Sequence, residues 1–285
     1  MAEGTAELER LRVVLVQMAS SQDWGENLRS VRRTLAGLDA PCDLVVFPEN
    51  VLCLGSSATV RAAARPAATV VEELGELARQ ARAVTVFGGV PVRDAERVTN
   101  AALVFAPDGR LLARYDKVHL FQLDPGSDAA IDETRTYTHG SGPVGFDWQG
   151  WRIGLSICYD VRFPELFRAY APCDLVLCTA AFTRSTGMAH WHVLLRARAI
   201  ENQCYVAGVG QCGTNPETGV PLFGHSLAID PWGEVLAEAG PEREEVLHVE
   251  LHKGRIDGVR RRLPALQHRR LGGGPQAVGG RRYRR

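Results

Sequence analysis

Short apolar runs alternate with amphipathic segments along most of the chain. The runs RVVLVQM (12–18) and DLVVFPE (43–49) predict buried strands. Residues 26–38 between them predict a helix, because apolar side chains recur there at spacings of three and four residues. These side chains are Leu28, Val31, Leu35 and Leu38. A second helix is predicted at 69–82, and it leads into a strand at 83–90.

The segment TNAALVFAPDGRLLARYDK (99–117) predicts a β-hairpin. Its two apolar runs are joined by Pro107, Asp108 and Gly109, residue types that favour tight turns. Further strands are predicted at 142–147, 151–158, 174–180, 204–210, 224–230 and 234–238, and further helices at 164–171 and 188–202. Since hairpin and helical connections occur together, we expect an α/β fold with mixed sheets packed by helices. Two such sheets are expected to pack face to face.

Composition limits the classes of protein that fit this pattern. With 285 residues, 45% hydrophobic and 23% charged, the chain is long enough for one large domain or two small ones. No apolar run approaches the roughly 18 residues of a spanning helix, and the start lacks the pattern of a secretion signal. The seven cysteines form no Cys-x-x-Cys pair and no Cys/His set at zinc-ligand spacing. We therefore expect a soluble cytoplasmic protein with reduced thiols and no metal.

Charge is unevenly distributed, although the formal net charge is zero. Residues 252–285 carry eleven Lys or Arg side chains against one acid, Asp257. The last part, 271–285, is rich in glycine and arginine, and we expect it to be a flexible basic tail. A tail alone gives weak, salt-sensitive attraction and not a binding face, so we expect no nucleic-acid partner.

Three polar residues stand at the ends of predicted apolar strands: Glu49, Lys117 and Cys158. Side chains at strand ends of α/β sheets tend to converge in one crevice. Taken singly, each has a simpler interpretation: a salt-bridged or capping surface acid, a solvated lysine at a hairpin end, and a thiol packed in the core. Taken together, they have a mechanism.

A nucleophilic cysteine needs a base or a positive environment, because a thiol with a pKa of about 8.5 is mostly protonated at neutral pH. Glu49 can take the proton of Cys158 and pass it to a departing amine, and Lys117 can stabilise the oxyanion. The segment after Cys158 can begin a helix whose amides favour the anion. No histidine is required, so we do not expect a base among the histidines near these segments. They are His119, His190, His192 and His225.

The segments FPEN (47–50), RYDKVHLF (114–121) and CYDVRFPELFR (158–168) resemble the three signature segments of the nitrilase superfamily of carbon-nitrogen hydrolases. The resemblance implies a single-domain, four-layer α-β-β-α sandwich over residues 11–270. It also implies a Glu-Lys-Cys triad that uses no metal or organic cofactor, and a homodimer or higher homo-oligomer formed through the outer helices.

By the same resemblance Glu49 is the general base, Lys117 the oxyanion-stabilising cation and Cys158 the nucleophile. Glu133 matches a second glutamate found in many members of the superfamily. The segments GMAHWHVLLRARAIENQCYV (187–206) and FGHSLAIDPWGEV (223–235) resemble the Nit-type amidases, especially the deaminated glutathione amidase group and less closely the omega-amidases.

This branch implies a small linear amide substrate that is cleaved to an acid and ammonia. Arg184 is a candidate for binding a substrate carboxylate, although a solvated loop arginine is equally consistent with the sequence. Tyr159 and Phe182 are candidate pocket walls, although aromatic residues at such places are often core. Arg162 and Glu165 are expected to form a structural ion pair beneath the cysteine.

Two departures from the Nit pattern concern the substrate: Met188, where proline is usual, and the loop at 121–132. Other activities use the same thioester chemistry, so an N-carbamoyl amino acid or carbamoylputrescine amidohydrolase, an aliphatic amidase and a nitrilase remain alternatives. The alternative outside enzymes is an inactive scaffold or binding module that keeps the fold.

Overall fold

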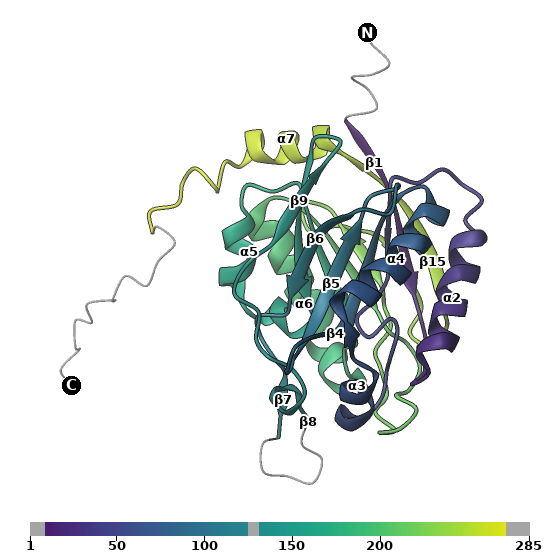
Figure 1. The fold of residues 1–285 in the computed structure, drawn as a ribbon. Helices are drawn as coiled ribbons and strands as arrows, with labels where there is room; N and C mark the ends of the chain where they lie inside the picture. The colour runs from purple at the N-terminus through teal and green to yellow at the C-terminus, as the bar shows by residue number, and fades with distance from the viewer. Residues whose placement is uncertain (1–8, 125–130, 272–285) are drawn as a thin grey trace, which may run out of the picture.

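Two β-sheets form the centre of the molecule (Figure 1). The computed structural model describes residues 9–124 and 131–271. In the first sheet β1, β2 and β4 are parallel, β15 and β5 are antiparallel to them, and β6 pairs antiparallel with β5. In spatial order its strands are β15 (Glu245–His252), β1 (Arg10–Gln17), β2 (Leu44–Val46), β4 (Val84–Asp94), β5 (Arg97–Phe105) and β6 (Leu111–Asp116), and the short β3 (Arg65–Pro66) pairs with β4.

The second sheet has a similar arrangement: β10, β11 and β12 are parallel, β9 and β13 are antiparallel to them, and β14 pairs antiparallel with β13. In spatial order its strands are β14 (Val235–Glu238), β13 (Leu227–Ile229), β12 (Tyr205–Gly210), β11 (Leu175–Ala180), β10 (Trp151–Ile157) and β9 (Gly145–Trp148). A small antiparallel ribbon consists of β7 (Gln122–Leu123) and β8 (Ile131–Asp132). The mixed α/β fold expected from the connections is therefore confirmed.

The two faces of β1 show how the layers pack, because side chains alternate along a strand. Val13 and Leu15 belong to an apolar cluster that also contains Leu177 of the second sheet. Val14 and Val16 belong to a different cluster with α2 (Trp24–Ala36) and α4 (Ala67–Ala81). The first sheet therefore contacts the second sheet on one face and helices on the other.

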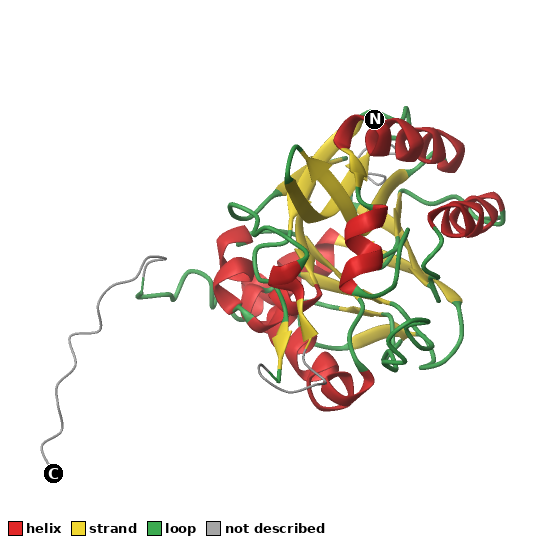
Figure 2. Ribbon diagram, turned by 60° about the horizontal axis from the view of Figure 1, so that its bottom comes forward, coloured by secondary structure: helices red, strands yellow, loops and turns green. Residues whose placement is uncertain are grey.

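Helices α5 (Pro164–Tyr170) and α6 (Arg184–Asn202) lie on the opposite side of the molecule from α2 and α4, and Figure 2 shows helices outside the strands. Glycines let both helices approach the second sheet closely. A Cβ on Gly208 of β12 would lie 2.5 Å from Leu195 of α6, and one on Gly154 of β10 would lie 2.7 Å from the ring of Tyr170. Neither strand position accepts a larger side chain without displacing a helix.

Several elements differ from the sequence prediction at their ends. Helix α6 begins at Arg184, a turn earlier than the predicted 188. Thr183 is the N-cap residue, and no residue of 184–187 prevents helix formation. The sequence pattern missed α3 (Ser57–Ala63), β15 and α7 (Lys253–Arg262). Strand β15 is half exposed along the sheet edge, so it lacks the continuous apolar run of a buried strand.

The basic segment near the C-terminus is partly built into the fold. Arg260 of α7 donates to the carbonyl oxygen of Gln203 over 3.2 Å, and Arg255 forms an ion pair with the buried Asp230. The domain limits at 11–270 stay a prediction, and nearly all of the expected tail, 272–285, lies outside the described residues. Among the helices of the described ranges, none combines the length and apolar character needed to cross a membrane.

Candidate active site

Glu49 follows β2 and is held by donors from three directions. Its Oε1 accepts from Asn100 Nδ2 over 2.9 Å and from Lys117 Nζ over 2.8 Å. Its Oε2 accepts from the backbone N–H of Ala181 over 2.8 Å. The residue is 2% exposed. Because both oxygens have fixed donors, the carboxylate cannot rotate freely, which suits a group that must accept a proton at one position.

Lys117 follows β6, at the end of the hairpin strand predicted from the sequence. Its Nζ lies 2.8 Å from Glu49 Oε1 and 2.8 Å from Glu133 Oε2. Burial disfavours the charge of this 1% exposed side chain, but the two carboxylates outweigh burial and raise the pKa of Lys117 well above its usual value. The ammonium group of Lys117 therefore stays protonated near neutral pH and does not act as an acid or a base.

Glu133 begins the short 3₁₀ helix η1 (Glu133–Arg135) and contacts Lys117 with both oxygens, at 3.0 and 2.8 Å. The backbone N–H of Phe121 also donates to its Oε2 over 2.7 Å. Burial raises the pKa of Glu133, Lys117 opposes this rise, and the negative charge of Glu49 adds to it. The structure therefore brings the second glutamate inferred from the resemblance to the far side of the lysine.

Cys158 stands at the junction between β10 and the 3₁₀ helix η2 (Cys158–Arg162). Its φ is 48°, in the left-handed region that non-glycine residues rarely adopt, so the chain turns sharply at the sulfur-bearing residue. Burial raises the pKa of the Cys158 thiol, Glu49 adds to the rise, and Lys117 opposes it. The contribution of the following helix to the thiolate stays a prediction, and the resting thiol depends on a base for its activation.

Asp160 fixes this turn, although the sequence pattern did not predict a role for it. Its carboxylate is fully buried and accepts from the hydroxyl of Tyr115 over 2.7 Å and from the backbone N–H of Ile157 over 2.9 Å. It also accepts from the backbone N–H of His119 over 3.0 Å, and the His119 ring nitrogen Nδ1 lies 2.7 Å away. Asp160 thus joins the lysine segment to the cysteine segment. The only sequence signal was an acid two residues after a strand-end cysteine.

Glu49, Lys117, Glu133 and Cys158 all line one cavity of about 450 Å³. The cavity lies where strands of both sheets end, next to the β7–β8 ribbon and α3. Apart from the acidic Asp132, the rest of the lining consists of apolar and neutral polar residues; these include Leu54, Val60, Phe121, Val220, Leu222, Ser57, Thr183, Asn215 and Thr218. Glu49, Lys117 and Cys158 therefore meet in one cavity, as expected for side chains at strand ends.

The candidate substrate residues divide into two groups. Tyr159 and Phe182 line a smaller cavity of about 20 Å³ that also reaches Cys158. Arg184 lines neither cavity: it begins α6, is 44% exposed, and pairs with Glu242 over 3.0 Å. The structure therefore brings the two aromatic candidates to the cysteine but not the arginine.

Arg162 does not form the expected ion pair with Glu165 within the described part of the chain. Its guanidinium lies 5.4 Å from the ring centroid of Phe182 and 5.7 Å from that of Tyr159, and its Nη1 lies 3.2 Å from His190 Nδ1. This expectation was wrong: the guanidinium lies near two aromatic rings and His190, where cation–π attraction favours it, and not beside the Glu165 carboxylate.

Comparisons with known proteins show the family of this chain. The family model described as carbon-nitrogen hydrolase matches residues 12–261, a span that includes Glu49, Lys117, Glu133 and Cys158. The chain belongs to the carbon-nitrogen hydrolase family. The resemblance to the nitrilase superfamily is thereby confirmed, and the chain is a hydrolase acting on carbon-nitrogen bonds other than peptide bonds.

Individual members of the family resemble this hydrolase over most of its length. A deaminated glutathione amidase of Synechocystis sp. is 39% identical over 263 residues, which cover 89% of this chain and 96% of the relative. The omega-amidase NIT2 of Homo sapiens is 38% identical over 201 residues, which cover 70% of this chain and 72% of the relative. A solved CN-hydrolase superfamily protein from Xanthomonas campestris, with an arsenic adduct in its active site, has a TM-score of 0.83 and 31% identity, covering 92% of this chain and 98% of that one.

Proposed function

We propose that this hydrolase is a thiol amidohydrolase that cleaves the terminal amide of a small linear substrate and releases ammonia. The observation that carries the proposal is that Glu49, Lys117 and Cys158 line one cavity, with the carboxylate 2.8 Å from the ammonium group. A base, a fixed cation and a nucleophile are the three groups that acyl transfer through a thioester requires.

In the first half of the reaction, the Cys158 thiol passes its proton to Glu49 while the sulfur attacks the amide carbonyl carbon. The carbonyl oxygen becomes an oxyanion, and the ammonium group of Lys117 stabilises it. The carbon–nitrogen bond then breaks, Glu49 returns the proton to the departing nitrogen, and ammonia leaves. The product on the enzyme is a Cys158 thioester.

In the second half, Glu49 removes a proton from a water molecule that attacks the thioester carbonyl. The tetrahedral intermediate collapses, the carbon–sulfur bond breaks, and the proton on Glu49 returns to the Cys158 sulfur. Lys117 keeps its proton throughout, which the raised pKa of its ammonium group supports. Glu133 acts as a positioning residue, since it holds Lys117 from the side opposite Glu49.

For the substrate we propose an ω-amide that also carries a carboxylate, because the relatives named above are a deaminated glutathione amidase and an omega-amidase. One observation favours a second candidate, a neutral aliphatic amide. Among the described residues that line the 450 Å³ cavity, Lys117 is the only one with a cationic side chain. An acidic substrate arm would then be bound by neutral donors.

A substrate panel tests the proposal and separates its branches. Ammonia release is measured for a carboxylate-bearing ω-amide, a neutral amide of equal length, N-carbamoyl amino acids and aliphatic nitriles, each with the wild type and Cys158→Ala. The proposal requires Cys158-dependent ammonia release from an ω-amide. Turnover confined to N-carbamoyl compounds or nitriles contradicts it, and equal turnover of the two amides favours the neutral substrate class.

We also propose that the enzyme forms homo-oligomers through α6 and works in the cytoplasm. Met188, Val193 and Ile200 of α6 are 74%, 68% and 48% exposed, which supports burial of this helix by a second copy. Light scattering on the full chain tests the oligomer: wild type should be at least dimeric and Val193→Glu smaller, whereas a monomeric wild type contradicts it.

The cytoplasmic location is supported by the cysteines. All seven are free, which fits a reducing compartment. The protein should be found in the cytosolic fraction of its source cells, and recovery outside that fraction contradicts the proposed location.

A further inference from the structure

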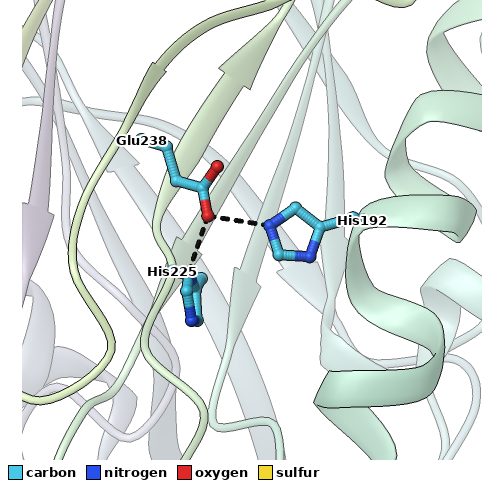
Figure 3. Close-up of side chains that lie close together, drawn as sticks. All are labelled: His192, His225 and Glu238. Atoms are coloured by element: carbon cyan, nitrogen blue, oxygen red, sulfur yellow. Dashed lines mark hydrogen bonds and ion pairs between the residues drawn. The ribbon is translucent and has the colours of Figure 1, made fainter.

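A second cluster of titratable side chains lies away from the catalytic cavity. His192 projects from α6, Glu238 is the last residue of β14, and His225 precedes β13 (Figure 3). Glu238 Oε1 lies 2.8 Å from His192 Nε2 and 2.6 Å from His225 Nδ1. None of the three residues is among those that line the two cavities at Cys158.

The backbone around His225 is fixed, so its ring does not reach Glu238 by chance rotation of a loose loop. The indole nitrogen of Trp191 donates to the carbonyl oxygen of His225 over 2.8 Å. His225 has a φ of 51°, in the left-handed region, and its ring lies 4.4 Å from that of Phe223 between centroids. The neighbouring residue of Trp191 on α6 is His192, whose ring lies 5.8 Å from the same phenylalanine.

We propose that His192, His225 and Glu238 bind one divalent transition-metal ion, with Zn²⁺ as the expected occupant. Two imidazoles and one carboxylate form a donor set that such an ion prefers, and it leaves a fourth position for water. The three ligand atoms already lie within 4.8 Å of one another. A tetrahedral zinc ion needs ligand atoms about 3.3 Å apart, so the two contacts to Glu238 lengthen by roughly half an ångström when the ion enters.

The proton balance of binding is simple. Each imidazole nitrogen that faces Glu238 must present its lone pair to the metal, so its proton moves to the other ring nitrogen, or leaves if the ring is protonated. Glu238 accepts no additional proton in this step. The side chains are 25% to 33% exposed, which leaves room for an ion and its water to enter.

The position of the cluster indicates a structural role for the ion. The N–H of Phe223 donates to the carbonyl oxygen of Phe182 over 2.9 Å, and Thr183 pairs with Leu222. Both Thr183 and Leu222 line the catalytic cavity. An ion held between α6, β14 and the segment before β13 therefore stabilises the wall of the cavity without contacting the substrate.

Metal binding by the full-length, untagged protein tests this proposal. Cys158→Ala serves as the background, because the reactive thiol would otherwise bind Zn²⁺ itself. After treatment with a chelator, Zn²⁺ is titrated by calorimetry and Co²⁺ by its visible absorption. We expect one ion per chain, and the Co²⁺ spectrum of a four-coordinate site with nitrogen and oxygen ligands.

Three substitutions in this background should each weaken binding by about tenfold or more: His192→Asn, His225→Asn and Glu238→Gln. Asparagine tolerates the left-handed backbone of residue 225, and glutamine keeps an acceptor oxygen for both rings, so the fold should be retained. His139→Asn is the matched control, because His139 is an exposed histidine bonded to the carbonyl oxygen of Val118, and it should leave binding unchanged. Absence of stoichiometric binding, or binding that persists unchanged in all three variants, overturns the proposal.

Discussion

The ammonium group of Lys117 donates to Glu49 over 2.8 Å while both side chains are almost completely buried. Such a pair is costly to desolvate, and it is retained only where its geometry and further hydrogen bonds compensate. Glu133 supplies that compensation from the other side of the lysine. The carboxylate and the cation therefore stand in fixed positions before any substrate arrives, which is the condition for electrostatic stabilisation of an oxyanion.

Glu133→Gln should lower kcat by about a hundredfold, with a smaller change in KM, because Lys117 loses one of its two counter-charges and its fixed position. Steady-state ammonia release measures this effect. Glu133→Asp is the matched comparison, since it keeps the charge and should restore part of the rate. Equal rates in wild type and Glu133→Gln would show that the second carboxylate has no part in positioning the lysine.

Asp160→Asn should lower both the free energy of unfolding, by about 2 kcal/mol, and kcat, because the buried carboxylate accepts from four donors around the Cys158 turn. An amide can accept at only one of its two ends, so the Tyr115 or His119 contacts are lost. Urea unfolding and ammonia release measure the two effects. The idea fails if the variant has wild-type stability.

The pKa of the Cys158 thiol is raised by burial and by the charge of Glu49, so alkylation by iodoacetamide should be slow at pH 7 and increase with pH well beyond the usual thiol range. Glu49→Gln removes the negative charge and should speed alkylation at pH 8 to 9, while it abolishes amide turnover by removing the base. Mass spectrometry of the modified peptide measures the rate. A parallel fall of alkylation and turnover in this variant would count against the assigned electrostatics.

Burial of a second thiol, that of Cys53, should make the free energy of unfolding fall at high pH. Because the folded-state pKa of Cys53 is raised by burial to about 11, the stabilising effect of its protonated form is complete below the unfolded thiol pKa and is lost as pH rises from about 9 to about 11. Urea unfolding across this pH range should show the loss, and Cys53→Ala should reduce its slope. An identical slope in the variant would mean that other thiols account for the effect.

Arg184→Ala should change kcat/KM for a carboxylate-bearing ω-amide by less than about twofold, because the guanidinium pairs with Glu242 outside the cavity. The neutral amide of equal length provides the control for an indirect effect. A KM increase confined to the acidic substrate would instead restore the arginine to the role considered from the sequence.

The sequence predicted the parts of this site that depend on strand ends. Glu49, Lys117 and Cys158 each follow an apolar run, and the sheet brings such positions together whatever the intervening loops do. Asp160 was missed because a buried acid near a cysteine has no periodic signal, and two of its partners, His119 and Tyr115, lie 41 and 45 residues away in sequence. The cluster of His192, His225 and Glu238 was missed for the same reason, since its spacing matches no zinc-ligand pattern.

The direction of a side chain was harder to predict than its place in the chain. Arg184 stands directly after Thr183, which lines the cavity, yet its guanidinium lies outside and pairs with Glu242. Arg162 was expected beneath the cysteine with Glu165 and instead lies between two aromatic rings. Rotamers of long side chains depend on neighbours from other segments, and a single sequence does not contain that information.

The most direct test is the mass of the protein during turnover. Wild type and Cys158→Ala are mixed with an ω-amide, quenched in acid within the first turnovers, digested and weighed, while ammonia is measured in parallel. The thioester mechanism predicts an acyl group on the peptide that contains Cys158, ammonia in equal amount in the first turnover, and neither product above background in the variant. Ammonia release by Cys158→Ala at the wild-type rate, or an acyl group on another residue, would contradict it.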